Sequence, residues 1–200
     1  MARLSATERR EALIEAALRV MQRDGLTAGT TRAIVAEAGM SLASFHYAFA
    51  SREDLLHELV QRVIGRELAA AMGSWRPEDG LAACLRAAAD GYLAHLEREA
   101  GQEQLMLELT LLALRRPDLQ PIAREQYRSY LSAATQLLGL AAELTGTRWR
   151  RPLPELARLL ITLVDGATTT WLVDRDTAAT RAVFEAAVDL FVEQHAQVPA

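Results

Sequence analysis

The sequence predicts an all-α protein of about nine helices. Half of its 200 residues are hydrophobic, whereas only 11 are Gly and 6 are Pro. Apolar residues recur at three- and four-residue spacings along most of the chain, which is the period of helices with one buried face. Runs of β-branched residues, which favour strands, are few. The length suffices for one large domain or two small ones with real hydrophobic cores.

The first helix is predicted to begin near Ser5 and to end at Asp24 and Gly25. Ser5 and Glu8 have the spacing of a capping box, although Thr7 could be the N-cap instead. Arg3, ahead of this helix, is available for a phosphate contact. One apolar face is made by Leu13, Ile14, Ala17, Leu18 and Met21.

The stretch from Thr30 to Phe49 predicts two short helices joined by a tight turn. Thr30 is a candidate N-cap of the first helix, and Gly39 supplies the left-handed residue that ends it. Ser41 can cap the second helix, whose Phe45 and Phe49 are four residues apart and point into one core. Such a pair of helices is a helix-turn-helix, whose second helix enters the DNA major groove. The residues expected near its exposed leading edge are Ser41, Leu42, Ala43, Ser44, His46 and Tyr47.

The rest of the chain is predicted to be a series of longer helices. A fourth helix begins after Ser51 and continues to about Met72. Residues 73–77 are the expected boundary, which gives a DNA-binding domain at 5–66 and a C-terminal regulatory domain at 74–196. The later helices are expected at 78–99, 102–115, 119–144, 155–173 and 177–194, with Gly101 separating the first two of them.

Charge is compatible with DNA binding without requiring it. The net charge of the chain is −4, but residues 1–52 contain seven Arg and five acidic residues, which leaves that part at +2. Attraction to DNA depends on such local patches and not on the net charge.

The composition argues against several other classes of protein. The single Cys84 excludes an internal disulfide and a CxxC metal site. No apolar run reaches the ~18 residues of a membrane span, and no secretory leader is apparent. Gly-rich phosphate loops and HExxH motifs are also lacking. We therefore expect a soluble, cytoplasmic protein that is not an enzyme, with no catalytic residues, no cofactor and no metal.

Residues 7–64 resemble the DNA-binding domain of the tetracycline-repressor (TetR) family. The later helices resemble the regulatory domain of this family in number, length and order only. The residues that carry the resemblance are Ala16, Ala17, Gly25, Thr30, Ile34, Val35, Ala36, Ala38, Gly39, Met40, Ser41, Phe45, Phe49 and the run from Ser51 to Leu56.

The resemblance implies a homodimer that places its two recognition helices in successive major grooves of a near-palindromic operator. It also implies a ligand-responsive repressor, in which an unknown small-molecule effector releases the DNA. At matching positions, Thr30 and Arg32 resemble phosphate or groove-edge contacts, and Arg52 stands where the family usually has a phosphate-binding Lys. His46 replaces the usual Tyr. Leu42 replaces a residue that is commonly polar, and it could pack on a thymine methyl.

Polar and aromatic side chains in the C-terminal half are candidates for the effector site. Glu108 interrupts an apolar helical face, where a charge is costly unless it is paired. For each candidate taken alone, core packing or an exposed ion pair remains the alternative. The candidates are Tyr92, His95, Met106, Glu108, Tyr127, Tyr130 and Trp171.

The last two helices are expected to form the dimer interface, with an ordinary internal hairpin as the alternative. One apolar stripe runs from Leu156 to Trp171, and the other runs from Ala182 to Phe191. Two further functions remain open from the sequence. One is a helical small-molecule binding protein or enzyme that has lost DNA binding, and the other is an architectural protein without a ligand.

Overall fold

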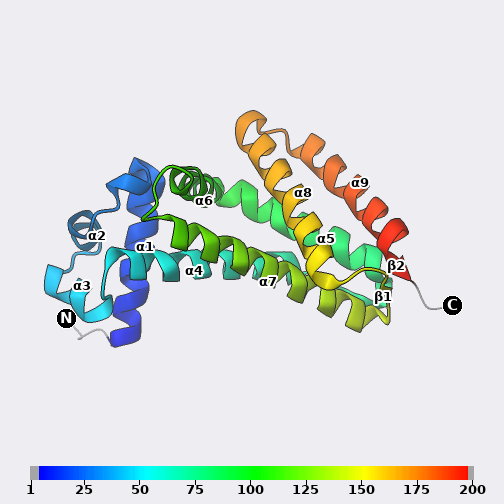
Figure 1. Cartoon of the computed structure of the whole chain (residues 1–200), viewed down its shortest axis with the longest axis horizontal. Coiled ribbons are helices and arrows are strands. Elements are labelled where there is room, and N and C mark those ends of the chain that lie inside the picture. The colour runs from blue at the N-terminus through cyan, green and yellow to red at the C-terminus, as the bar shows by residue number, and fades with distance from the viewer. Residues whose placement is uncertain (1–4, 198–200) are drawn as a thin grey trace. The chain divides into compact units, whose positions relative to one another are not determined.

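The computed structural model describes residues 5–197 and groups them into two compact units. Unit 1 contains the chain up to Val63 together with Gly101–Gln126, and unit 2 contains Ile64–Ala100 and the chain from Tyr127 onward. Within the described range there are nine α-helices, which confirms the all-α prediction (Figure 1). The domains predicted from the sequence, 5–66 and 74–196, follow chain order, whereas the compact units do not. Arg3 lies outside the described residues.

Local hydrogen bonds begin and end the helices of unit 1 as predicted. Helix α1 (Ala6–Asp24) is capped by Ser5, which forms a reciprocal capping box with Glu8, and Gly25 ends it at φ 87°. The 3-10 helix η1 (Leu26–Ala28) then leads into α2 (Thr31–Glu37) and α3 (Leu42–Ala48). Gly39, between α2 and α3, has φ 63°, the left-handed conformation that favours glycine.

The three N-terminal helices share one core, again as predicted. Helix α1 packs against both α2 and α3 (Figure 1). Phe45 and Phe49 are fully buried, and their ring centroids lie 5.6 Å apart. The buried residues of α1 are Leu13, Ile14, Ala16, Ala17, Leu18, Val20 and Met21.

Helix α4 (Arg52–Met72) also has the predicted bounds. The hydroxyl of Ser51 accepts a hydrogen bond from the Asp54 amide at 3.1 Å, as an N-cap does. After the 3-10 helix η2 (Pro77–Asp79), Gly80 at φ 87° delays α5 (Leu81–Arg98) beyond its predicted start.

One predicted break is wrong. Gly101 lies inside α6 (Ala100–Ala113), and the residue that separates the helices is Glu99, at φ −119° and ψ 30°. The Glu99 amide still bonds to the carbonyl of His95, so the chain bends within one residue without needing a glycine. At Gly101 a Cβ would instead lie 3.5 Å from the side chain of Gln22.

Unit 2 is closed by a strand pair that the sequence did not predict. Helix α7 (Gln120–Thr145) ends at Gly146, and β1 (Arg148–Trp149) then pairs antiparallel with β2 (Ala196–Gln197). The Trp149 indole N–H donates to the Leu138 carbonyl at 2.9 Å. In the sequence, the two strands are separated by α8 (Leu153–Asp174) and α9 (Thr177–His195), which run side by side (Figure 1).

The α8 stripe predicted for the dimer interface belongs largely to the core of unit 2. Leu156 packs with residues of α5, α7 and α9, and Trp171 packs with Leu93, Leu96 and Phe184. Phe191 of α9 is buried as well. On α9, by contrast, most of the predicted stripe stays accessible, since Ala182, Val183, Ala186 and Leu190 are exposed.

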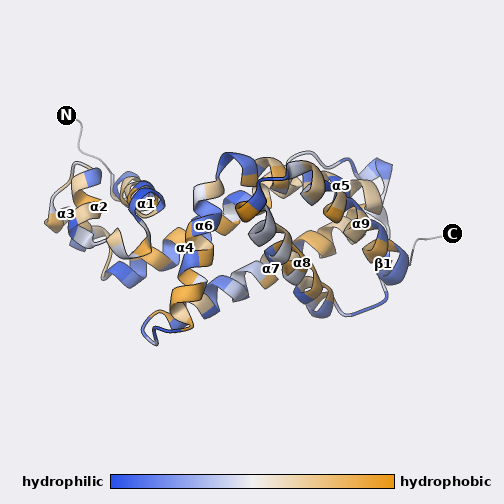
Figure 2. Ribbon diagram, turned by 90° about the horizontal axis from the view of Figure 1, so that it is seen from above, coloured by the Kyte–Doolittle hydropathy of each residue, from blue (hydrophilic) through white to orange (hydrophobic). Residues whose placement is uncertain are grey.

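Helix α8 is the one described helix whose length and composition would allow it to cross a membrane. Its most apolar 18-residue window has a mean hydropathy of 1.3, and 28% of that window is buried. Since the core helix of a soluble protein passes the same test, this is weak evidence. The helices in general carry both hydrophobic and hydrophilic residues, as amphipathic packing requires (Figure 2).

Replacing Gly91 by Ala should destabilise unit 2. A Cβ at Gly91 of α5 would lie 2.2 Å from the backbone carbonyl oxygen of Ala70 in α4, so the two helices would have to separate. We expect a loss of about 1–3 kcal/mol in the free energy of unfolding, measured by urea denaturation.

Gly65→Ala is the matched control. Gly65 lies in α4 with open space around it. Its substitution by Ala should therefore increase the free energy of unfolding, by at most about 1 kcal/mol, because Ala has the higher helix propensity. Equal effects of the two substitutions would contradict the close α4–α5 contact.

Candidate functional site

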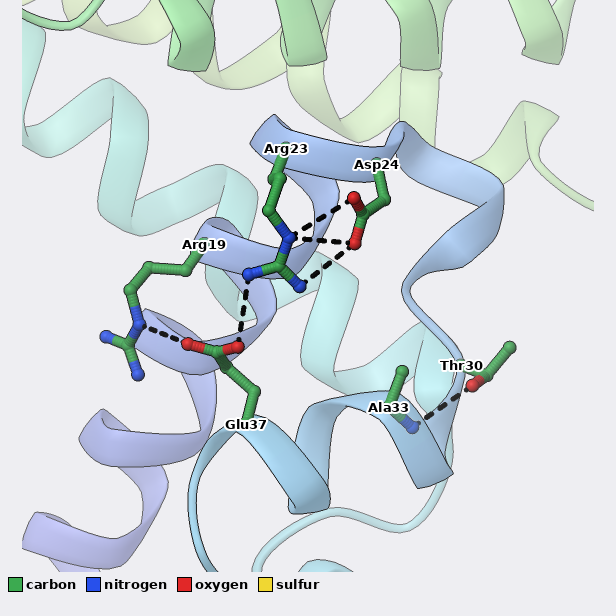
Figure 3. Close-up of polar contacts among 6 residues, drawn as sticks. All are labelled: Arg19, Arg23, Asp24, Thr30, Ala33 and Glu37. Atoms are coloured by element: carbon green, nitrogen blue, oxygen red, sulfur yellow. Dashed lines mark hydrogen bonds and ion pairs between the residues drawn. The ribbon is translucent and has the colours of Figure 1, made fainter.

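The helix-turn-helix is built from two short helices with side-chain caps. The Thr30 hydroxyl accepts from the Ala33 amide at 3.2 Å at the start of α2 (Figure 3). The Ser41 hydroxyl accepts from the Ser44 amide at 3.2 Å at the start of α3. The two serine hydroxyls also lie 3.0 Å apart. These bonds satisfy amides that would otherwise have no partner at the helix start.

Most of the predicted DNA contacts lie on accessible surface. Tyr47 is 73% exposed and Leu42 is 44% exposed, which is unusual for large apolar or aromatic side chains. Ser44 and Arg52 are half-buried. The exposed candidates are Thr30, Arg32, Ser41, Leu42, Ala43, His46 and Tyr47.

An ion-pair network ties α2 to the end of α1 (Figure 3). The Glu37 carboxylate accepts from Arg19 Nε at 2.9 Å and pairs with Arg23 Nη1 at 3.3 Å. Arg23 also pairs with Asp24 at 2.9 Å. Hydrogen bonds from Arg19 and then Arg23 lower the pKa of Glu37. A shared network of this kind orients α2 more firmly than a single exposed ion pair would.

Two arginines of α1 belong to the site, although the sequence analysis did not nominate them. The Arg9 guanidinium lies over the Tyr47 ring, 5.0 Å from its centroid, which brings a positive charge to the exposed face of α3. Arg10 donates to the Ala48 carbonyl and pairs with Glu58 of α4, which holds the end of α3. No local pattern could indicate these contacts, because the residues of α1 and α3 that they join are 38 positions apart in the sequence and meet only on folding.

Arg52 is engaged with the protein backbone. Its Nε donates to the Gly29 carbonyl at 2.6 Å, and its Nη2 donates to the Leu26 carbonyl at 2.7 Å. Burial lowers the pKa of the guanidinium. Three of its five N–H donors are not used by these two bonds, so a phosphate contact by Arg52 stays a prediction.

Glu108, a candidate for the effector site, is hydrogen-bonded to the same short helix. Its Oε2 accepts from the Leu26 amide at 3.0 Å, at the start of η1, where an amide needs an outside acceptor. Glu108 and Met106 belong to unit 1, whereas the five other effector candidates belong to unit 2. A ligand contact by Glu108 stays a prediction, but its position has a structural explanation.

In unit 2, two tyrosines from different helices contact α8. The Tyr127 hydroxyl donates to Asp165 Oδ2 at 3.0 Å, and the Tyr92 and Thr168 hydroxyls lie 2.7 Å apart. The Tyr127 and Tyr130 ring centroids are 5.9 Å apart, with the rings edge to face. Asp165 and Thr168 were not nominated from the sequence, although an acid within the apolar part of α8 is a detectable signal.

The two remaining effector candidates are more deeply placed. His95 is 5% exposed, and burial lowers its pKa. The Trp171 indole N–H donates to the Thr177 hydroxyl at 3.1 Å, and the Arg175 guanidinium lies over the indole ring. Trp171 therefore packs at the α8–α9 turn, where core packing accounts for it.

Two capped short helices on a three-helix core, with an exposed second helix, define a helix-turn-helix DNA-binding protein. Residues 13–59 match the family described as "Bacterial regulatory proteins, tetR family". Residues 76–194 match "Tetracyclin repressor-like, C-terminal domain". The chain belongs to the TetR family, whose members are transcriptional regulators, and it is a DNA-binding regulator.

Relatives along the full length agree with this family. The nicotine-responsive transcriptional repressor HdnoR of Paenarthrobacter nicotinovorans is 26% identical over 198 residues, which cover 96% of this chain and 98% of HdnoR. A crystal structure of a putative TetR-family regulator from Rhodococcus sp. superposes with a TM-score of 0.79 at 20% identity, covering 92% of this chain and 98% of that one. The regulator FadR from Bacillus subtilis, solved with stearoyl-CoA, gives a TM-score of 0.68 at 17% identity, covering 91% and 97%.

Arg52→Ala should destabilise unit 1. The substitution removes the donors to the Gly29 and Leu26 carbonyls, and we expect a loss of about 1–3 kcal/mol in the free energy of unfolding, measured by urea denaturation. Arg32→Ala is the control, since Arg32 is exposed on α2, and its effect should stay within about 0.5 kcal/mol. An unchanged unfolding midpoint for Arg52→Ala would contradict the structural role. If Arg52→Ala also reduces the salt dependence of DNA binding by about one charge, Arg52 contacts a phosphate in addition to its structural role.

Proposed function

We propose that this regulator is a ligand-responsive repressor that binds a near-palindromic operator as a homodimer. The observation that carries the proposal is the exposed leading edge of α3. Its capped N-terminus presents small and polar side chains, and residues 41–48 contain no acid that would repel phosphates.

The contacts to DNA divide into two kinds. Arginines and helix N-termini bind phosphates and supply most of the affinity, whereas a few side chains in the groove supply specificity. We assign Thr30, Arg32 and Arg9 to the first role. We assign Ser44 and Tyr47 to the second role, with Leu42 packing on a thymine methyl.

The exposed faces of α8 and α9 support the dimer. Val173 is 84% exposed and Val183 is 52% exposed, and Leu159 and Leu190 are also exposed. Ala182 and Ala186 lie beside Val183 on α9, and such small residues permit close helix approach. Two helices from each subunit would form a four-helix interface and cover this apolar surface.

The effector would bind in the C-terminal part of the chain. Responsiveness to a small molecule is supported by the relative HdnoR, whose name describes a response to nicotine. An effector releases DNA only if it binds one arrangement of the recognition helices more tightly than the other. The contact of Glu108 in α6 with η1 supports a route by which helix movements reach the helix-turn-helix. We expect the protein to act in the cytoplasm, where the DNA is.

Selection of random duplex DNA by the purified protein tests the DNA-binding proposal. We expect enrichment of a near-palindromic site whose half-sites are about one helical turn apart. Tyr47→Ala should weaken binding to that site by about tenfold, because it removes a side chain from the groove and the ring under Arg9.

Tyr47→Phe is the matched control, because it keeps the ring that Arg9 covers and removes only the hydroxyl. Normal binding by Tyr47→Ala would remove this residue from the interface. No enriched site, also after refolding to remove a bound ligand, would favour a small-molecule binding protein that has lost DNA binding.

Val183→Glu should convert the dimer into a monomer. The substitution places a charge in the centre of the exposed α9 face, where burying it against a second copy is costly. Sedimentation should give twice the chain mass for the wild type and one chain mass for the variant at micromolar concentration. Leu114→Glu is the control, since Leu114 is an exposed apolar residue in the turn that follows α6. A folded wild-type monomer, or a dimer disrupted only by Leu114→Glu, would contradict the proposed interface.

A further inference from the structure

We propose that Asp165 binds the positively charged nitrogen of an organic amine effector, with the rings of Tyr92, Tyr127 and Tyr130 around the amine. The inference rests on the proposed ligand response and specifies the chemical class of the effector.

Asp165 occupies an unusual position for an acid. Between Leu159 and Trp171, α8 carries no other ionisable side chain. The neighbouring Val164, Ala167 and Trp171 pack in the core cluster with Phe184, and Asp165 itself is half-buried. The other acids of α8, Glu155 and Asp174, are exposed near its ends. The charge of Asp165 is thus placed where water solvates it poorly.

The protein supplies no cation for this charge. In residues 5–197, the one side-chain hydrogen bond to the Asp165 carboxylate comes from the neutral Tyr127 hydroxyl, and no ion pair includes it. Elsewhere in unit 2, Asp90 pairs with Arg181 and Asp189 pairs with Arg86. Burial raises the pKa of Asp165, and the bond from Tyr127 opposes this only in part. A half-buried carboxylate without a cation is costly, and a cationic ligand would offset that cost.

The surrounding groups are suited to an organic cation. Tyr127 and Tyr130 come from α7, and Tyr92 comes from α5 and reaches Thr168, which is three residues from Asp165 on the same helix. Residues three apart lie on one face of a helix, so the two tyrosine contacts flank the same part of α8. Aromatic rings attract ammonium groups through their π faces.

A neutral effector fits these groups less well. A hydroxyl or amide donor could bond to the remaining lone pairs of the carboxylate, but it would leave the negative charge uncompensated. A structural role as an acceptor for Tyr127 does not need a charge either, because an Asn would accept the same bond. A contact with a cationic ligand therefore explains why this position carries a charged Asp165 and not a neutral acceptor.

The test compares amines with neutral molecules of similar shape. The probes are nicotine with cotinine, and N,N-dimethylbenzylamine with benzyl methyl ether. In each pair the first is a cation at neutral pH and the second is neutral. Binding to the purified protein is measured by isothermal titration calorimetry and by quenching of tryptophan fluorescence. We expect at least one amine to bind about tenfold or more tightly than its neutral partner.

Asp165→Asn should abolish this preference, bringing the two members of the pair to within about twofold. Tyr127→Phe keeps the carboxylate and should retain the preference for the cation. Asp174→Asn, which removes an exposed charge from the same helix, should behave as the wild type. Urea denaturation of every variant separates loss of binding from loss of folding.

Three results would overturn the inference: no amine binds better than its neutral partner, Asp165→Asn keeps the preference, or Asp174→Asn loses it equally. The outcome is distinguishable from a failure of the proposed function. An amine that binds through Asp165 to a protein that selects no DNA site would support the inference and reject the repressor. A selected operator together with no preference for cations would support the repressor and reject the inference about Asp165.

Discussion

The arrangement of the DNA-binding helices depends on how the short helix η1 is held. The amide of its first residue, Leu26, donates to Glu108 of α6, and the Leu26 carbonyl accepts from Arg52 of α4. Arg52 also donates to the Gly29 carbonyl. A single-turn 3-10 helix has too few internal bonds to keep its own orientation. Because η1 connects α1 to α2, these side chains of opposite charge set the direction in which the helix-turn-helix leaves α1. They also join it to α4 and α6.

The recognition helix is positioned by its neighbours and leaves its own reading surface unoccupied. Phe45 and Phe49 anchor its inner face, Arg10 holds its end, and Ser41 caps its start. Apart from Ser41, which is itself exposed, the side chains that support α3 differ from those that face outward. This separation lets most outward residues vary with the operator at little cost to the fold, as expected when function lies on a rigid scaffold. The stacking of Arg9 on Tyr47 is a second exception, because it restrains an outward side chain.

Helix α8 has two faces with different roles. Its inner face carries Trp171 in the core, the half-buried Asp165 bonds to Tyr127, and its outer face carries Leu159 and Val173. A rigid helix that contacts an effector on one side and a partner subunit on the other would link the two binding events. Such a link needs no long chain of residues, since a helix moves as a unit.

The sequence by itself determined the local features of this protein. The caps at Ser5, Thr30, Ser41 and Ser51, the left-handed Gly39 and the apolar faces depend on residues within one or two helical turns. From these the helix-turn-helix and its exposed edge could be predicted. The β1–β2 pair, the roles of Arg9 and Arg10, the bonding of Glu108 and Arg52, and the setting of Asp165 could not. Each of these joins groups that are distant in the chain, so only the tertiary structure decided which donor meets which acceptor and which charge is left without a partner.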